Sequence, residues 1–496
     1  MNLDTGSPAI AARYDAIAYA AVPHALTHVD RLATVATLLG MSPPAVADCR
    51  VLEVGCNDGA NLIPMALVLP AAHFVGCDLS ARALDEGRRT IARLGLANIR
   101  LVEEDLARLS PAYGGFDYII AHGVYSWVRV TVRDALFALV AERLAPNGIL
   151  FVSFNVLPGS RVRQAAWEVL HRHANHIDDP RARMDAVRRL ARIIGATGNT
   201  SHDGEDALRA EFAAIAARSD SALFHDDLAL PNDPVYFTDF VAHAARFGLS
   251  YLAEADLHTM SGAGLSPDAR DFVAAQEPAA REQYLDFIRL RRFRQSLLRR
   301  SGATIDASKH AERIHAMYVS ADASLLRAEA AGKTGELANR LAPGTLGGGA
   351  ARTLLDALLK RAPAAYPIAA LRDIVGFQGL ARPLGALLTE AFVAGIVNLH
   401  VHPPALAAVG GMRPVASPLA RVQAEARDEV TGLLHARVRL PDPNARRLLT
   451  LLDGTRDRAA LAAAMVGPPS GLDRDTAGQF VDYALEQFGR LALLVA

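Results

Sequence analysis

Short apolar runs alternate with helical patterns between residues 50 and 155, and this alternation constrains the fold more than any other feature. Nearly continuous apolar strands separated by helices are typical of a parallel sheet that helices cover on both faces. The sequence therefore predicts an α/β fold with a Rossmann-like core and right-handed crossovers. The expected strands are 50–56, 73–79, 99–105, 116–123 and 149–155, and the expected helices include 61–69, 81–95 and 132–144.

Single residues mark the ends of these elements. Ser80 is suited to cap the start of the helix at 81–95, and Gly95 is suited to end it. Pro146, Asn147 and Gly148 predict a turn just before the strand at 149–155.

The chain beyond this core predicts an insertion followed by two smaller modules. Residues 161–217 have a helical pattern, and two later strand-like runs, 249–257 and 291–300, are expected to return to the sheet. Segment 312–329 predicts a hairpin or short strands, and the Gly- and Pro-rich segment 341–350 predicts a linker. Helical patterns followed by strand pairs predict winged-helix-like modules. The expected units are 1–160, 161–300, 301–415 and 416–496.

Composition limits the classes of partner. Lys and Arg total 52 against 53 for Asp and Glu, a balance that argues against a globally basic nucleic-acid binder and leaves a local basic patch open. The three cysteines, Cys49, Cys56 and Cys77, favour a reducing cytoplasm over a disulfide framework. The first residues make a poor secretory signal, and the sequence has no apolar stretch of about 18 residues, so no membrane span is expected.

The motif EVGCNDGAN (53–61) lies between the first strand and the first helix. Gly55 and Gly59 allow a sharp turn and a close approach of the backbone to a ligand. A dinucleotide site needs Gly-x-Gly-x-x-Gly, which is absent, and Glu53 and Asp58 would repel phosphates. A ligand that carries positive charge and no phosphate suits this loop better, and S-adenosylmethionine fits that description.

Acids at two later strand ends extend the site. Asp78, followed by Leu79, is suited to accept hydrogen bonds from both ribose hydroxyls. Asp105, followed by Leu106, is placed to meet the exocyclic amine of adenine. Taken in order with Glu53 and the glycine loop, these features resemble the class I S-adenosylmethionine-dependent methyltransferases.

A narrower resemblance rests on Tyr14-Asp15 ahead of Tyr19 and on the segments 27–43, 51–66, 116–128 and 237–257. These look like methyltransferases with a methyltransferase regulatory domain, a group that includes rickettsial lysine methyltransferases acting on outer membrane proteins. The resemblance covers residues 1–300 and implies S-adenosylmethionine as cofactor, often a homodimer, and a protein lysine as methyl acceptor. It departs from the usual pattern at Asn57, which stands in place of the middle glycine; asparagine tolerates the left-handed backbone better than other non-glycine residues.

The end of the fourth strand supplies the candidate catalytic residues. His122 is expected to act as a base or to hydrogen-bond the cofactor, with a satisfied strand-end histidine as the alternative. Tyr125 and Trp127 are expected to wall a channel for an alkyl amine by cation–π contact. Core packing is an equal alternative for both aromatic residues. Tyr14 and Tyr19 are expected to fold over the cofactor as a lid, with simple packing as the alternative.

The remaining cofactor-binding candidates are Asn57 and Asn61 of the loop, and Asn155 is a candidate for contact with substrate. No metal site is expected, because His171, His173 and His176 are too loosely spaced; Cys56 and Cys77 are interpreted as small apolar filler. The arginine-rich run 291–300 predicts a solvated face or contact with an acidic partner.

Three hypotheses of function follow. The first is methylation of a protein side-chain amine, the second methylation of a small molecule, and the third an interaction protein that keeps the fold without catalysis. The third helical pattern of the first winged-helix-like module, 381–395, has one arginine and offers little to phosphates, so protein docking or dimerisation is favoured over nucleic-acid binding.

Overall fold

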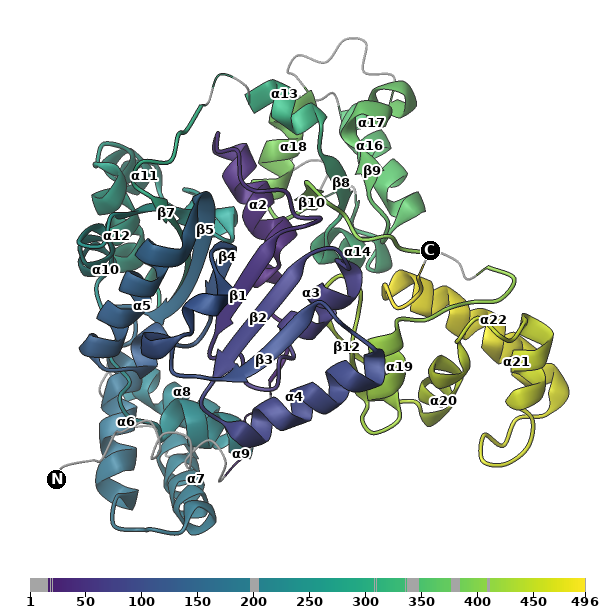
Figure 1. The fold of residues 1–496 in the computed structure, drawn as a ribbon, viewed down its shortest axis with the longest axis horizontal. Coiled ribbons are helices and arrows are strands. Elements are labelled where there is room, and N and C mark those ends of the chain that lie inside the picture. The colour runs from purple at the N-terminus through teal and green to yellow at the C-terminus, as the bar shows by residue number, and fades with distance from the viewer. Residues whose placement is uncertain are drawn as a thin grey trace.

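The computed structural model describes residues 17, 19, 21–196, 205–306, 308, 310–334, 336, 348–375, 384–407 and 411–495. Tyr14 and most of the predicted linker, 341–347, lie outside the described residues. Figure 1 shows a central sheet with helices on both sides. In both views the C-terminal segment, drawn in yellow, lies at the end of the molecule opposite the helices that follow the core.

Seven strands of the described chain form one sheet in the order β3-β2-β1-β4-β5-β7-β6. The first five run parallel, β7 runs antiparallel to β5, and β6 runs antiparallel to β7. The predicted α/β class and the return of both late runs to the sheet are thereby confirmed. The strands are β1 (Arg50–Val54), β2 (His73–Asp78), β3 (Ile99–Glu103), β4 (Phe116–Ala121), β5 (Leu144–Asn155), β6 (Leu249–Glu254) and β7 (Phe293–Arg300).

Helices cover both faces of the sheet because successive side chains of a strand point to opposite sides. In β1, Val51 belongs to the apolar cluster under α2, α3 and α4, and Leu52 belongs to the cluster under α5 and α10. As predicted, the Ser80 hydroxyl accepts a hydrogen bond from the Ala83 amide, and Gly95 ends α4 with a left-handed φ of 66°. These helices are α2 (Val29–Leu38), α3 (Leu62–Val68), α4 (Ala81–Leu94), α5 (Val130–Arg143) and α10 (Phe237–Ala245).

The turn predicted at Pro146, Asn147 and Gly148 is wrong, because these residues lie inside β5. The strand begins at Leu144 and absorbs them as an irregularity: Leu144 pairs with Phe116, but the next paired position is Ile149 with Tyr118. Gly148 makes this detour possible, since a Cβ there would lie 2.8 Å from the Asp117 carbonyl oxygen.

The segment between β5 and β6 is helical, as predicted, and has a hydrophobic cluster of its own. Its elements are α6 (Arg161–Ala174), α7 (Pro180–Ala196), α8 (Glu205–Ala216), α9 (Asp220–Ala222) and η5 (Leu223–Asp227). Between β6 and β7 lie η6 (Leu257–Met260), α11 (Pro267–Ala274) and α12 (Pro278–Arg289).

The prediction of a solvated face for the arginine-rich run is wrong at Arg294, whose side chain is buried. Its guanidinium lies 2.6 Å from the Glu254 carboxylate, 3.1 Å from that of Glu282 and 2.9 Å from that of Asp286. The acidic partner is therefore intramolecular, and it joins β7 to β6 and α12. A buried guanidinium needs such paired carboxylates, because an unpaired charge in the interior is costly.

The prediction of a hairpin or short strands at 312–329 is wrong in part, because that segment holds one strand between two helices. Asp322 ends the strand by accepting a hydrogen bond from the Ser324 amide and starting the next helix. Further along, β10, β8 and β9 form a small antiparallel sheet. The elements are α13 (His310–His315), β8 (Tyr318–Ala321), α14 (Ala323–Ala330), α16 (Gly348–Arg361), β9 (Tyr366–Pro367), α17 (Ile368–Val375), α18 (Leu384–Val393) and β10 (Val397–His400).

The C-terminal segment packs around its own apolar cluster. A hairpin of β11 and β12 follows its first helix, and the last residues return to pair with earlier ones, Leu494 with Ala416 and Val495 with Leu406. The elements are α19 (Pro418–Ala424), β11 (Glu429–Thr431), β12 (Arg437–Arg439), α20 (Pro443–Leu451), α21 (Arg458–Ala464) and α22 (Arg474–Arg490).

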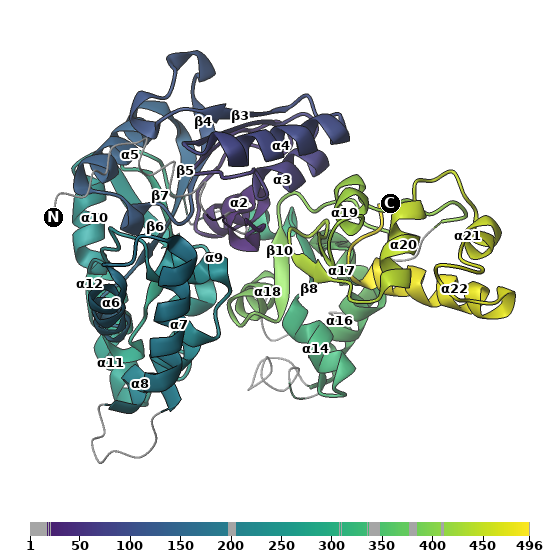
Figure 2. The ribbon, with the colours of Figure 1, turned by 90° about the horizontal axis from the view of Figure 1, so that it is seen from below.

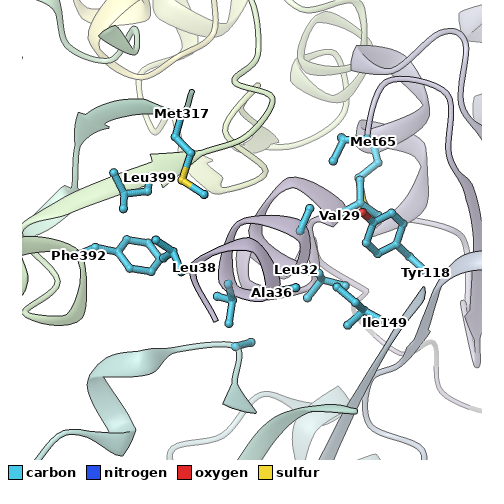
Figure 3. Packing of buried hydrophobic residues seen from close by; sticks show 14 of the residues in the cluster. Val29, Leu32, Ala36, Leu38, Met65, Tyr118, Ile149, Met317, Phe392 and Leu399 are labelled. Carbon is cyan, nitrogen blue, oxygen red and sulfur yellow. The ribbon is translucent and has the colours of Figure 1, made fainter. Parts of the chain in front are cut away.

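Helix α2 is buried between the main sheet and the segment that contains β8 and β10. Figure 3 shows Leu32 facing Ile149 of the sheet, while Leu38 faces Phe392 of α18. A polar contact accompanies this packing: the Asp30 carboxylate lies 2.8 Å from Nδ1 of His400 and accepts a second hydrogen bond from the His402 amide at 2.7 Å.

We predict that Asp30→Ala lowers the free energy of unfolding by about 2 kcal/mol, because it leaves buried donors without their acceptor. Urea denaturation followed by circular dichroism measures the change. Asp48→Ala, at an exposed position, is the matched control and is expected to have no measurable effect. Equal stability of Asp30→Ala and the control would contradict the prediction.

Candidate functional site

The loop between β1 and α3 turns through left-handed backbone at Gly55, Asn57 and Gly59, with φ of 72°, 51° and 73°. Asn57 therefore adopts the conformation for which the sequence suggested a glycine, and its side-chain oxygen accepts a hydrogen bond from the Asp58 amide at 2.7 Å. That local bond is the kind that lets asparagine occupy this region.

The Asp78 carboxylate is fixed beside this loop at the end of β2. One oxygen accepts a hydrogen bond from the Asn57 amide at 2.8 Å and the other accepts one from the Ser80 amide at 2.9 Å. Leu79, the next residue, is half-buried. Two backbone donors orient the carboxylate, which suits recognition of a diol.

Asp105 follows β3 at the same edge of the sheet. Its carboxylate accepts a hydrogen bond from the Ala107 amide at 3.0 Å and starts the short helix η2 (Leu106–Arg108). Leu106 packs partly against the apolar cluster under α5. The structure therefore brings Asp78 and Asp105 to the ends of neighbouring strands, as the sequence predicted.

Glu53 and Asn61 form a buried pair under the loop. The Asn61 amide nitrogen donates to Oε1 of Glu53 at 2.8 Å, while Oε2 of Glu53 is buried and has no hydrogen-bond partner in the described residues. Burial raises the pKa of Glu53 to about 8, the bond from Asn61 opposes that rise, and the nearby Asp78 and Asp58 add to it. Because an adjacent cation favours the ionised carboxylate, the pair is suited to a positively charged ligand group.

Two histidine rings stack at the end of β4. The ring of His122 lies 3.7 Å from that of His24, centroid to centroid, and 6.2 Å from that of Phe293. Burial lowers the pKa of His122 to about 3, helped by His24, and lowers that of His24 to about 4, helped by Arg437. Both imidazoles are therefore neutral at pH 7, and each has an unprotonated nitrogen that can accept a hydrogen bond.

Tyr125 and Trp127 lie in the turn after β4, called η4 (Tyr125–Trp127). The Tyr125 ring is buried among phenylalanines of the second cluster, and its hydroxyl lies 2.8 Å from Nδ1 of His243 on α10. The Trp127 ring lies 6.5 Å from that of Trp167 on α6. Both contacts fit the alternative that these aromatic residues pack in the core. Their role as walls of a substrate channel stays a prediction.

The other candidates are placed as follows. Tyr19 is exposed, and its ring lies 5.2 Å from that of His225 in η5, so it contacts the helical segment between β5 and β6. Asn155 donates from its side chain to the Asn232 side chain at 2.9 Å. Cys56 and Cys77 are buried beside the loop, and burial raises the pKa of both thiols, which fits small apolar filler. Among the described residues, no group of three or more His, Cys, Asp or Glu side chains is placed to hold a metal ion.

Sequence reasoning missed the residues that surround Asn61. Its side-chain oxygen lies 2.9 Å from the His24 amide nitrogen, 3.1 Å from the Thr27 hydroxyl and 2.8 Å from Nε2 of His435. His24 and Thr27 lie in and before the short helix η1 (Ala25–Thr27), close to segments that carried the family resemblance. His435 comes from the C-terminal hairpin, and no spacing in the sequence connects it with the loop.

Three families match parts of the chain. Residues 52–150 match the family described as "Methyltransferase domain", residues 219–300 match "Predicted methyltransferase regulatory domain", and residues 413–468 match "PKMT, C-terminal winged helix domain". The uncharacterized protein RP028 of Rickettsia prowazekii is 31% identical over 234 residues, which are 47% of this chain and 94% of that protein. The chain belongs to the S-adenosylmethionine-dependent methyltransferases that carry this regulatory domain.

Two further similarities extend over more of this methyltransferase. The uncharacterized protein RP789 of Rickettsia prowazekii is 36% identical over 296 residues, and the chain spans only 54% of that protein's length. The structure of PKMT2 from Rickettsia typhi aligns with a TM-score of 0.77 at 24% identity, over 96% of this chain and 100% of that one. The same protein in complex with AdoHcy aligns with a TM-score of 0.76. At this identity the alignment shows a shared fold.

Among the described residues of this methyltransferase, no helix is both long enough and apolar enough to cross a membrane.

We predict that stability depends on pH through Glu53. Its folded pKa of about 8 lies above the unfolded value of 4.5, so the stability it contributes is complete below pH 4.5 and is lost as pH rises through 8. Melting temperatures of the wild type and Glu53→Gln, compared from pH 5 to pH 9, measure this. The two are expected to diverge in favour of Glu53→Gln up to about pH 8, and parallel curves would contradict the prediction.

Proposed function

We propose that this methyltransferase methylates the side-chain amine of lysine in a protein. The observation that carries the proposal is the stacked His24–His122 pair at the end of β4, near the acids proposed to hold the cofactor, because an unprotonated imidazole nitrogen there can accept a hydrogen bond from an amine. A lysine amine is protonated at neutral pH and must lose that proton before it can attack a methyl group. The resemblance of the sequence to rickettsial lysine methyltransferases supports the same acceptor.

Under this proposal the acids of the loop hold the cofactor. Asp78 would accept hydrogen bonds from the ribose hydroxyls, Asp105 and the adjacent Leu106 would contact adenine, and Glu53 would pair with the ammonium group. Bound S-adenosylmethionine supplies a methyl group on a sulfonium that is already a good leaving group. Tyr19 would cover the site as a lid, and its ring lies beside that of His225 in η5.

The protein's own contribution is positioning and removal of a proton. His122, stacked on His24 and edge to face with Phe293, would accept a hydrogen bond from the lysine amine and so orient it, while the ammonium proton would leave to solvent as the side chain is desolvated. The free amine would then be placed to receive the methyl group in line, with the sulfur of bound S-adenosylmethionine as the leaving group. Exclusion of water by the surrounding aromatic rings favours the neutral amine, because desolvation penalises the charged form.

We propose that the chain is divided into the units 1–160, 161–300, 301–415 and 416–496. The last two units would recruit the protein substrate. Homodimerisation, a cytoplasmic location and the absence of nucleic-acid binding stay predictions made from the sequence.

Label transfer tests the proposed function. The full chain is incubated with methyl-labelled S-adenosylmethionine and a cell lysate, and labelled protein is hydrolysed and analysed for methylated lysine. We expect the label in protein as methyllysine, and we expect Asp78→Ala to weaken cofactor binding at least tenfold, because it removes a charged acceptor. The exposed variant Asp85→Ala is the matched control. Label found only in low-mass extract would replace the proposal with a small-molecule acceptor.

We further predict that His122→Ala lowers turnover at saturating cofactor at least tenfold while the Kd for S-adenosylhomocysteine stays within about twofold, because the lysine amine loses the acceptor that orients it. Steady-state kinetics and calorimetry measure the two quantities, with the exposed His173→Ala as control. The opposite pattern, a weaker Kd with normal turnover, would assign His122 to cofactor binding.

A further inference from the structure

His435 places a side chain of the C-terminal hairpin inside the core. It lies in the turn between β11 and β12, has a left-handed φ of 57° and is 2% exposed. Its Nε2 atom lies 2.8 Å from Oδ1 of Asn61, a residue 374 positions earlier in the chain. The ring also meets that of His28 edge to face, with centroids 5.3 Å apart.

The partners of Asn61 fix which atom of His435 carries the proton. Oδ1 of Asn61 accepts a hydrogen bond from the His24 backbone amide, which can only donate, so this atom is the amide oxygen. His435 must therefore donate from Nε2, and its Nδ1 is the unprotonated nitrogen. Burial, with smaller contributions from His28 and His24, holds the pKa of His435 well below its ordinary value, in agreement with a neutral ring.

The bond from His435 has a consequence on the opposite side of the Asn61 amide. With Oδ1 held by donors, the Nδ2 group must point the other way, where it donates to Oε1 of Glu53 at 2.8 Å and to the Thr27 hydroxyl at 2.9 Å. A flipped amide would set the His24 amide hydrogen against an NH₂ group and Glu53 against an oxygen. The hairpin therefore takes part in orienting the carboxyl group of Glu53.

The turn itself is built to present this ring. The His435 amide donates to the Gly432 carbonyl at 3.0 Å, and the Leu433 amide donates to the Ala492 carbonyl at 2.9 Å, which ties the turn to the end of the chain. Glycine would adopt this left-handed backbone at lower cost than histidine, so the backbone conformation alone does not explain the side chain. Nδ1 of His435 is buried without a hydrogen-bond partner in the part of the chain that the structure describes, which is a further cost.

We propose that His435 is a positioning residue for the cofactor site: the C-terminal hairpin completes that site by orienting Asn61 and, through it, Glu53. This inference rests on the proposed role of Glu53 toward the cofactor's ammonium group. It couples docking of the C-terminal segment to cofactor affinity, so that the site reaches full affinity only when the hairpin is seated.

A second contact between the same parts provides a control. Arg93 of α4 forms an exposed ion pair with Glu425, the residue that follows α19. Exposed pairs of this kind contribute little to stability. Arg93→Ala thus alters the same interface without touching Asn61 or Glu53.

Calorimetry with S-adenosylhomocysteine on the full chain tests the proposal. We expect His435→Ala to raise the Kd about tenfold, the equivalent of one lost hydrogen bond, and Arg93→Ala to change it less than twofold. His435→Gln keeps a side-chain donor and is expected to recover most of the affinity. Turnover at saturating cofactor is expected to stay within about twofold, because the residue acts through binding.

A double-mutant cycle separates this role from general packing. If His435 acts through Glu53, then His435→Ala is expected to have little further effect on the Kd in a Glu53→Gln background. Additive effects of the two changes, or an unchanged Kd together with a lower melting temperature in His435→Ala, would overturn the proposal. Failure of the wild type itself to bind S-adenosylhomocysteine would instead contradict the assigned cofactor site, so the two failures are distinguishable.

Discussion

The buried contact between Asp30 of α2 and His400 of β10 is the interaction on which the arrangement of the site depends. It joins α2, which packs on the main sheet, to the small sheet of β8, β9 and β10. His400 in turn contacts the Ser320 hydroxyl at 2.9 Å. The chain just before α2 supplies His24 and Thr27, which contact Asn61. Because these residues are continuous with α2, its placement also sets the position of the His24 ring on His122.

The parts of the fold that arise from local patterns were predictable from the sequence. Apolar periodicity located the strands, Ser80 and Gly95 marked the ends of α4, and the loop motif with its strand-end acids indicated the cofactor. The pairing of His435 with Asn61 could not be found in this way. Neutral histidines in an apolar stretch leave no periodic signal, and the partners are 374 positions apart.

Residues that are neighbours in the sequence after β4 also lie on opposite sides of the sheet. His122 stacks on His24 on the side of the first apolar cluster, whereas Tyr125, three positions later, packs with Phe137 and Phe240 on the other side. The turn η4 lies between the two environments. Motif reading grouped these residues as one site, and only the three-dimensional path of the chain separates them.

The late position of β7 affects how this protein is made. Strand β5 ends at Asn155, but β7, which covers its outer edge, begins only at Phe293. At a synthesis rate of about 5–20 residues per second, that edge stays open on the ribosome for roughly 7 to 28 seconds. Open strand edges pair readily with other chains, so the uncovered edge of β5 is a site for aggregation during this period.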